Sequence, residues 1–212
     1  MAQPNDGSGR APVAIVRPTT SVTSGVEVTQ KLVGAAVAFG NLINGTFGPN
    51  GLDKMLYKTN GEASVTNDGA KIVAELLVKH PAAKAFVLLA ESQENACGDG
   101  VTGCVIMASE LMREAGRLLE KGLHPLVLVN GYQTALKYTL EHLEEVEIEV
   151  DLSDKETLLS IANTAMTGTS AEISSNKLSE VVIDATIQVT STEEKDSHSI
   201  NTEDIRISKS GK

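Results

Sequence analysis

The chain has 212 residues, enough for one or two domains, and its 41% hydrophobic and 22% charged residues are ordinary for a folded globular protein. This composition excludes a disordered or collagen-like chain. The formal net charge of −10 argues against nucleic acid and against anionic membrane surfaces as partners, and the absence of Trp argues further against nucleic acid, which stacks on aromatic side chains.

Neither a membrane-spanning helix nor a secretory signal is predicted. The longest stretch without a charged residue, Leu32 to Leu52, contains Asn, Gly and Pro49, which do not suit a spanning helix. Residues 1–10 are polar, and no apolar segment follows a basic start. We therefore expect a cytoplasmic location, in which Cys97 and Cys104 stay reduced and serve as small buried hydrophobic residues.

The first elements are a flexible arm and a helix. Residues 1–23 are rich in Pro, Gly, Ser and Thr, which predicts a flexible N-terminal arm. Ser24 and Glu27 then have the spacing of a capping box. Apolar residues at helical spacing follow as far as Leu42, so a helix is predicted to begin at Ser24 and to end before Gly45.

A β-hairpin and further helices come next. Residues 52–58 and 62–66 flank a Thr-Asn-Gly turn, which predicts the hairpin. A helix is expected from Gly69 to about Lys79, where His80-Pro81 ends it because the residue before proline avoids the helical region. Later helices are expected over residues 82–96, 101–122 and 125–144, and the alternation of charged and β-branched residues in 145–150 predicts a strand.

The pattern changes after Val150, where a second domain is predicted. Ser153 and Glu156 repeat the capping-box form and open a helix to about Met166. The remaining expected elements are a Thr167-Gly168-Thr169 loop, a helix over 171–189, a polar stretch over 190–198 and a short strand over 204–208. The fold is therefore predicted to be mainly α with a small β-hairpin or sheet, and not a Rossmann fold.

Two acidic turns that open into helices are the candidates for chemistry. A helix start presents unpaired N–H groups and a partial positive charge, which stabilise a phosphate. Asp99, in Gly98-Asp99-Gly100, would repel that phosphate unless a divalent cation lay between them, so it is a candidate Mg²⁺ ligand. Thr102 would add a hydroxyl donor, and Asp68, in Asn67-Asp68-Gly69, would orient water. Each turn alone is more often a simple turn or helix cap, so the spacing leaves both interpretations open.

The motifs taken together resemble one family. Gly-Pro-Asn-Gly-Leu-Asp-Lys-Met-Leu at 48–56, Thr-Asn-Asp-Gly at 66–69, His-Pro-Ala-Ala-Lys at 80–84 and Gly-Asp-Gly at 98–100 are similar to the group II chaperonins, which are the archaeal thermosome and its eukaryotic cytosolic relatives. The resemblance continues through His124-Pro125, Gly131-Tyr132 and Thr167-Gly168 and covers about residues 24–210.

This resemblance implies a fold and a function. Residues 24–150 would form the N-terminal part of a multihelical equatorial domain, which binds ATP and makes ring contacts. Residues 151–212 would form the first half of an α/β intermediate domain, and the apical domain that grips unfolded protein would be absent. The implied function is that of an ATP-binding subunit of a ring-shaped chaperone that assists folding of non-native proteins, driven by ATP binding and hydrolysis, with other chaperonin subunits and unfolded clients as partners.

The resemblance also implies roles for individual residues. Gly48 and Pro49 would belong to the loop that closes over the nucleotide, Asp99 would bind Mg²⁺, and Asp68 would be the catalytic aspartate near the attacking water. The implied phosphate contacts are Gly98, Gly100 and Thr102. The hairpin over 53–66 would pair with a neighbouring subunit in the ring, since its exposed edges fit strand addition.

Three departures from the family pattern leave ATP hydrolysis open. The chain reads Val101-Thr102-Gly103 where the family commonly has a run of threonines, so two hydroxyls are lost, and Thr169 stands where the family usually has a lysine that senses the terminal phosphate. The second catalytic aspartate and the C-terminal equatorial half of the pocket would also be missing. We therefore expect the 212-residue chain alone to bind ATP poorly, not to hydrolyse it, and to be oligomeric or partly folded. The alternative function is that of a truncated, non-catalytic chaperonin-like subunit acting as an interaction or capping protein.

Overall fold

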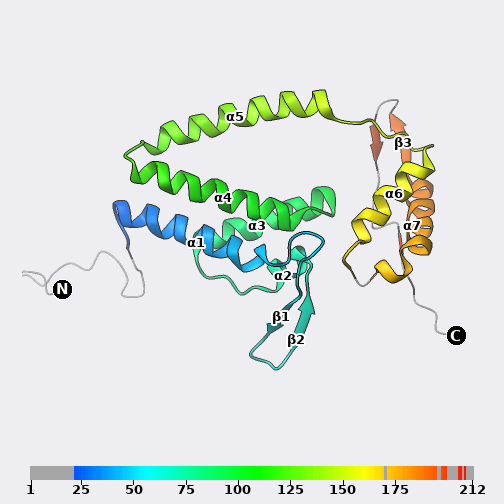
Figure 1. The fold of residues 1–212 in the computed structure, drawn as a ribbon, viewed down its shortest axis with the longest axis horizontal. Coiled ribbons are helices and arrows are strands. Elements are labelled where there is room, and N and C mark those ends of the chain that lie inside the picture. Colours follow the sequence, from blue (N-terminus) through cyan, green and yellow to red (C-terminus); the bar gives the residue numbers. More distant parts are fainter. Residues whose placement is uncertain (1–21, 170, 195–196, 200–204, 207, 209–212) are drawn as a thin grey trace, which may run out of the picture.

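The computed structural model describes residues 22–169, 171–194, 197–199, 205–206 and 208, and these form a mainly α structure with two small antiparallel sheets (Figure 1). The elements in chain order are α1 (Val26–Asn44), β1 (Lys54–Tyr57), β2 (Ala63–Thr66), α2 (Gly69–Glu75), α3 (Pro81–Cys97), α4 (Val101–Glu120), α5 (Pro125–Val146), α6 (Lys155–Met166), the 3-10 helix η1 (Glu172–Ser174), α7 (Ser175–Val189), β3 (Ser191–Glu194) and β4 (Ser197–Ser199). The mainly α fold with a hairpin is confirmed. Almost all of the arm predicted over residues 1–23 lies outside the described residues.

The main hydrophobic core lies among α1, α2, α3 and α4. The apolar residues that recur at helical spacing on each helix turn toward the others. Phe39 of α1 and Phe86 of α3 meet at its centre, with 5.6 Å between their ring centroids. Ile43, Ile72 and Val105 are fully buried around them. This core fixes the relative positions of the loops that connect these helices.

Helices α1 and α4 run antiparallel and in close contact. A side chain at Gly40 would collide with Ser109, and one at Gly116 would collide with Val33, so glycine permits the approach at both ends of the contact. The α4 start and the α1 end therefore lie at the same end of this helix pair, which is the end where the loop before β1 begins.

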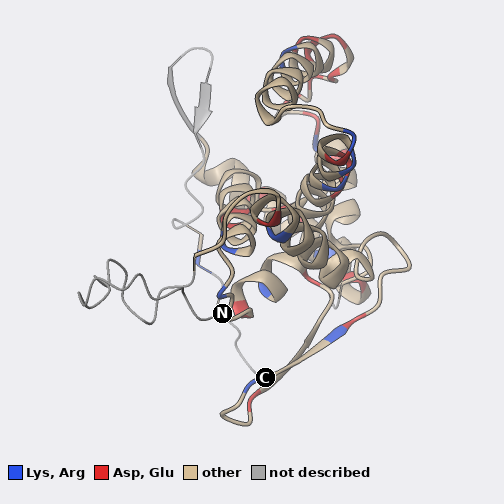
Figure 2. Cartoon of the chain, turned by 90° about the vertical axis from the view of Figure 1, so that its left-hand side faces the viewer, with Lys and Arg blue, Asp and Glu red and all other residues tan. Residues whose placement is uncertain are grey.

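The predicted hairpin is confirmed. Strands β1 and β2 pair antiparallel with Met55 opposite Val65, and Asn60 Oδ1 accepts the Glu62 N–H at 3.1 Å inside the turn. Leu56 packs against the core, whereas Met55 and Val65 on the other side are exposed. Figure 2 shows acidic and basic residues spread over several elements of the chain, and at the hairpin turn Lys58 Nζ lies 3.8 Å from Glu62 Oε2.

The remaining helices lie outside the main core. Helix α5 follows α4 (Figure 1), and the Tyr132 hydroxyl donates to the Leu111 carbonyl at 2.6 Å, but no residue of α5 is buried. Helices α6 and α7 pack on each other, with the Ser179 hydroxyl 3.0 Å from Asn163 Oδ1 and Ile183 buried. Among the described residues, no helix is both long and apolar enough to cross a membrane.

Two predicted helix caps were wrong. The α1 N-cap is Gly25, at φ 68°, rather than Ser24, and glycine has no side chain to cap the helix. Glu27 pairs with Lys31 at 2.9 Å. The α6 N-cap is Asp154 rather than Ser153. Its carboxylate is a stronger acceptor than a hydroxyl and accepts both the N–H and the hydroxyl of Thr157.

Helix α2 is shorter than predicted. It ends at Glu75 rather than near Lys79, because Leu76 adopts an extended conformation. In that conformation alternate side chains face the same way. Leu76 and Val78 therefore pack on the core, whereas Leu77 is 92% exposed.

The strands predicted after residue 144 also differ from those in the structure. Helix α5 continues to Val146, and residues 147–150 form no strand because no partner strand pairs with them. The polar stretch predicted over 190–198, for which no strand was predicted, contains β3 and most of β4, which pair antiparallel. Of the strand predicted over 204–208, residues 204 and 207 lie outside the described residues, and the others are not in a strand. Cys97 is exposed rather than buried, and Cys104 is half-buried.

Candidate functional site

The predicted site residues meet at one cleft of about 600 Å³. Its lining residues come from the segments 46–48, 66–71, 98–103 and 165–169, together with Glu94 of α3. All but one of the predicted site residues are among them, namely Gly48, Asp68, Gly98, Asp99, Gly100 and Thr102; Pro49 is not. The volume lies in the range of small-molecule sites.

Asp68 and Asp99 line the same cleft, and both are exposed. One oxygen of each carboxylate is used by its own turn, since Asp68 Oδ1 accepts the Ala70 N–H at 2.9 Å and Asp99 Oδ1 accepts the Gly100 N–H at 2.7 Å. Gln93 Nε2 also donates to the Asp99 carbonyl at 2.9 Å, which holds that turn in place. These hydrogen bonds leave the Oδ2 atom of each aspartate unused.

The two helix starts at the cleft are not equivalent. Helix α2 has only seven residues, and Asp68 caps its first turn. Helix α4 has 20 residues, and its N-cap is Gly100 at φ 77°, which supplies no side-chain cap. Because the first-turn N–H groups of α4 are uncapped, α4 is the helix that can donate to a phosphate.

Gly69 brings the two turns together. It is buried at the start of α2, and a Cβ atom there would collide with the side chain of Thr102 in the first turn of α4. Glycine therefore sets the distance between the Asp68 turn and the Thr102 hydroxyl. No role beyond the turn is predicted for Gly69 from the sequence, because its contact with Thr102 joins positions that are remote in the chain.

The wall formed by residues 165–169 is joined to the Asp68 turn by one hydrogen bond. Asn67 Nδ2 donates to the Gly168 carbonyl at 2.9 Å, and Glu172 Oε2 accepts the Gly168 N–H at 2.9 Å. The Thr169 hydroxyl donates to the Met166 carbonyl at 2.7 Å. Asn67, which had no predicted role of its own, thus positions one wall of the cleft.

The donor set suits Mg²⁺ together with a phosphate ligand. Among the described residues, no group of three or more His, Cys, Asp and Glu side chains gathers into a metal cage. Mg²⁺ is ordinarily held by one or two carboxylates together with substrate phosphates and water. Asp99 Oδ2, beside the α4 N-terminus, fits that arrangement.

Residues 39–212 match the TCP-1/cpn60 chaperonin family. The chain belongs to this family. It is 39% identical over 198 residues to the thermosome subunit beta of Archaeoglobus fulgidus and 40% identical over 198 residues to the thermosome subunit alpha of Methanothermobacter thermautotrophicus, which is 93% of the chain and 36% of either relative. It is 43% identical over 176 residues, 82% of the chain and 32% of the relative, to the thermosome subunit of Methanopyrus kandleri. The chain thus spans about a third of the length of these relatives, and the resemblance to group II chaperonins is confirmed.

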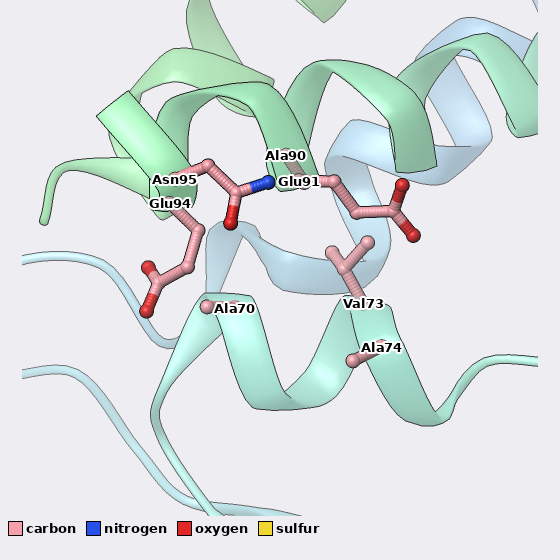
Figure 3. Close-up of a pocket in the computed structure, with 7 residues that line it drawn as sticks. All are labelled: Ala70, Val73, Ala74, Ala90, Glu91, Glu94 and Asn95. Carbon is pink, nitrogen blue, oxygen red and sulfur yellow. The ribbon is translucent and has the colours of Figure 1, made fainter. Parts of the chain in front are cut away.

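A second, smaller cavity lies between α2 and α3, next to the cleft. Figure 3 shows Glu91, Glu94 and Asn95 of α3 facing Ala70, Val73 and Ala74 of α2 around a cavity of about 120 Å³. This volume is below the range of small-molecule sites. Glu94 lines both spaces, so it contributes a third carboxylate to the main cleft.

Other lining residues of the chaperonin cleft were missed by the sequence analysis. Thr46 and Phe47 precede Gly48 in the loop after α1, and the Thr46 hydroxyl donates to the Ile43 carbonyl at 2.8 Å. Lys71 lies in the first turn of α2. Lys71 follows Asp68 by three residues, so the i, i+3 spacing of a helix could have indicated it. No local pattern marks Phe47 or Glu94 as neighbours of the acidic turns.

Proposed function

We propose that this cleft binds Mg-ATP and that the chain is the ATP-binding part of a subunit of a ring-shaped chaperone. The chaperone would assist the folding of non-native proteins in the cytoplasm, driven by ATP binding and hydrolysis. The observation that supports the proposal is the meeting of Asp68, Asp99, Thr102 and the uncapped α4 N-terminus at one cleft. Together these groups supply donors for phosphate and oxygen ligands for Mg²⁺.

Each group has a distinct role in the proposal. The N–H groups of the α4 first turn and the Thr102 hydroxyl donate to phosphate oxygens, and Gly98 and Gly100 let the backbone come close to them. Asp99 Oδ2 binds Mg²⁺, which neutralises phosphate charge when present. Asp68 Oδ2 orients the attacking water. Gly48 and Pro49 belong to the loop over the nucleotide.

The proposed domain division and partners follow the family. Residues 24–150 would be the N-terminal equatorial part, and residues 151–212 the first half of the intermediate domain. The relatives are thermosome subunits, and we expect this chain to join other chaperonin subunits in a ring. The hairpin supports this expectation, because Met55 and Val65 lie opposite each other on its exposed side. Unfolded clients would bind through regions outside this chain.

The second candidate is a non-catalytic subunit that inserts into or caps a ring. It is favoured by Thr169, whose uncharged hydroxyl already donates to the Met166 carbonyl. Rings assembled with and without this chain separate the two candidates. Unchanged ATP turnover per subunit supports the catalytic role, and reduced turnover supports the capping role.

The proposal is tested by isothermal titration of the 212-residue chain with Mg-ATP. Asp99→Asn keeps the acceptor for the Gly100 N–H but removes the negative charge that holds Mg²⁺. We expect it to weaken Mg-ATP binding about tenfold or more, the scale of a lost hydrogen bond or ligand to a charged group. Asp53→Asn, at an exposed residue outside the cleft, should leave binding unchanged. Weak binding suffices, because the variants are compared with each other; equal affinity of wild type and Asp99→Asn would contradict the proposal.

A further inference from the structure

The cleft contains a single basic residue among its lining side chains. Asp68, Glu94 and Asp99 contribute three carboxylates, and Lys71 contributes the one ammonium group. A nucleoside triphosphate would add further negative charge to a cleft that is already acidic. Lys71 is therefore the only side chain of this lining that attracts the anion as a full positive charge.

The Lys71 ammonium is available to a ligand. Lys71 is exposed, and within the described residues neither an ion pair nor a hydrogen bond engages its Nζ atom. Other lysines are paired, such as Lys155, whose Nζ lies 2.7 Å from Asp184 Oδ1. Lys71 lines the same cleft as three carboxylates and contacts none of them.

The location of Lys71 is not explained by helix stability. It is the third residue of α2, and a positive side chain near a helix N-terminus is destabilising because the N-terminus carries a partial positive charge. The next two residues, Ile72 and Val73, are buried in the core and hold the backbone of Lys71 at the cleft. The residue is thus held at the cleft although the local electrostatics disfavour its charge.

We infer that Lys71 binds the terminal phosphate of the nucleoside triphosphate and makes the cleft prefer a triphosphate to a diphosphate. This inference rests on the proposed function. Asp68 and Lys71 are three residues apart, so they lie on the same side of α2, and the proposed water of Asp68 attacks the terminal phosphate. The opposite wall supplies no positive charge, since the residues that line it are Ala165, Thr167, Gly168 and Thr169.

The test compares the affinities for Mg-ATP and Mg-ADP by isothermal titration of the full 212-residue chain. Lys71→Gln should weaken Mg-ATP binding about tenfold and Mg-ADP binding less than about twofold, because only the triphosphate loses a charge-assisted contact. Lys71→Arg keeps the charge and should bind Mg-ATP within about threefold of wild type.

Lys177→Gln is the matched control. Lys177 is also the third residue of its helix, α7, and is exposed, but it does not line the cleft. It should leave both affinities unchanged. Thermal unfolding should show that Lys71→Gln folds as wild type does, since the side chain is exposed and its removal relieves an unfavourable charge.

The outcomes separate this inference from the proposed function. If the wild type binds Mg-ATP in an Asp99-dependent way but Lys71→Gln leaves the ratio of the two affinities unchanged, the role of Lys71 is overturned and the proposed function stands. If the wild type binds neither nucleotide, both are overturned. A selective loss of Mg-ATP affinity in Lys71→Gln that Lys71→Arg restores supports the inference.

Discussion

At the scale of the residue, the site depends on one glycine as much as on its aspartates. Gly69 is buried against Thr102, and any side chain there would displace a proposed phosphate donor. Gly34, in the middle of α1, has an exposed position with no atom near the place where its Cβ would lie. The close contact with Thr102 therefore requires glycine at position 69, whereas position 34 has room for a side chain.

Gly69→Ala is expected to lower the free energy of unfolding by about 1–3 kcal/mol, which is typical of overpacking. It should also weaken Mg-ATP binding, because Thr102 must move. Gly34→Ala should instead raise stability by about 0.5–1 kcal/mol, since alanine is the better helix former. Urea denaturation followed by circular dichroism measures both changes. A Gly69→Ala variant as stable as Gly34→Ala would show that the contact with Thr102 relaxes without cost.

At the scale of the element, the N-terminal caps of some helices can be predicted from the sequence and those of others cannot. His80 and His124 each precede a proline and accept the N–H two residues later at Nδ1, both at 3.2 Å. The prolines mark these boundaries plainly. Ser153 and Asp154 are adjacent potential caps, and only the fold shows that Asp154 is used.

The Asp154 cap makes the stability of α6 depend on pH. The Thr157 hydroxyl and N–H, both donating to the carboxylate, lower the pKa of Asp154 below 3.8. The folded pKa lies below the unfolded one, so the carboxylate stabilises the fold above about pH 4, and this contribution is lost as the pH falls through 3.8 and then through the lower folded value.

Asp154→Ala should therefore lower the melting temperature at pH 7, and the difference from wild type should shrink below pH 3.8. Thermal unfolding followed by circular dichroism at pH 7, 5 and 3 measures the effect. Ser153→Ala is the control and should change the melting temperature little, because its side chain caps no N–H group of α6. An equal difference at all three pH values would show that the loss is not electrostatic.

At the scale of the whole molecule, α5 presents an apolar surface that the described residues do not cover. None of its residues is buried. Its large apolar side chains recur at helical spacing and are exposed, including Leu126, Val129, Leu136, Leu140 and Leu143. Continuous apolar surface of this kind promotes association. This agrees with the expectation of an oligomeric chain.

We expect the chain to self-associate at micromolar concentration and the double variant Leu136→Glu, Leu140→Glu to be largely monomeric. Both side chains are more than half exposed, at 58% and 53%, so the variant should fold normally. Light scattering coupled to size-exclusion chromatography measures the mass. Ile173→Glu, at a 96% exposed residue outside α5, is the matched control and should not change it. A monodisperse wild-type monomer would contradict the prediction.

Much of the fold could be read from local patterns. The hairpin follows from its Thr-Asn-Gly turn, and α3 and α5 follow from His-Pro starts. The end of α2 at Glu75 could not be read in this way, because the apolar residues over 76–78 fit a helix as well as a strand and only contact with the core selects the extended conformation of Leu76. The strand predicted over residues 145–150 was wrong, because a segment with a strand-like pattern forms no sheet when no partner strand pairs with it.

The sequence by itself determined the helix-forming segments and the acidic turns, because these depend on residues a few positions apart, and it determined the family through the motifs taken together. The tertiary structure alone decided that the turns share a cleft with Lys71, Glu94 and the Gly168 wall. The hydrogen bond from Asn67 to Gly168 joins residues 101 positions apart, so no local pattern encodes it. Packing of α1 to α4 brings the two acidic turns together, and the Asn67–Gly168 hydrogen bond adds the wall of residues 165–169, so the chemistry of the cleft depends on both.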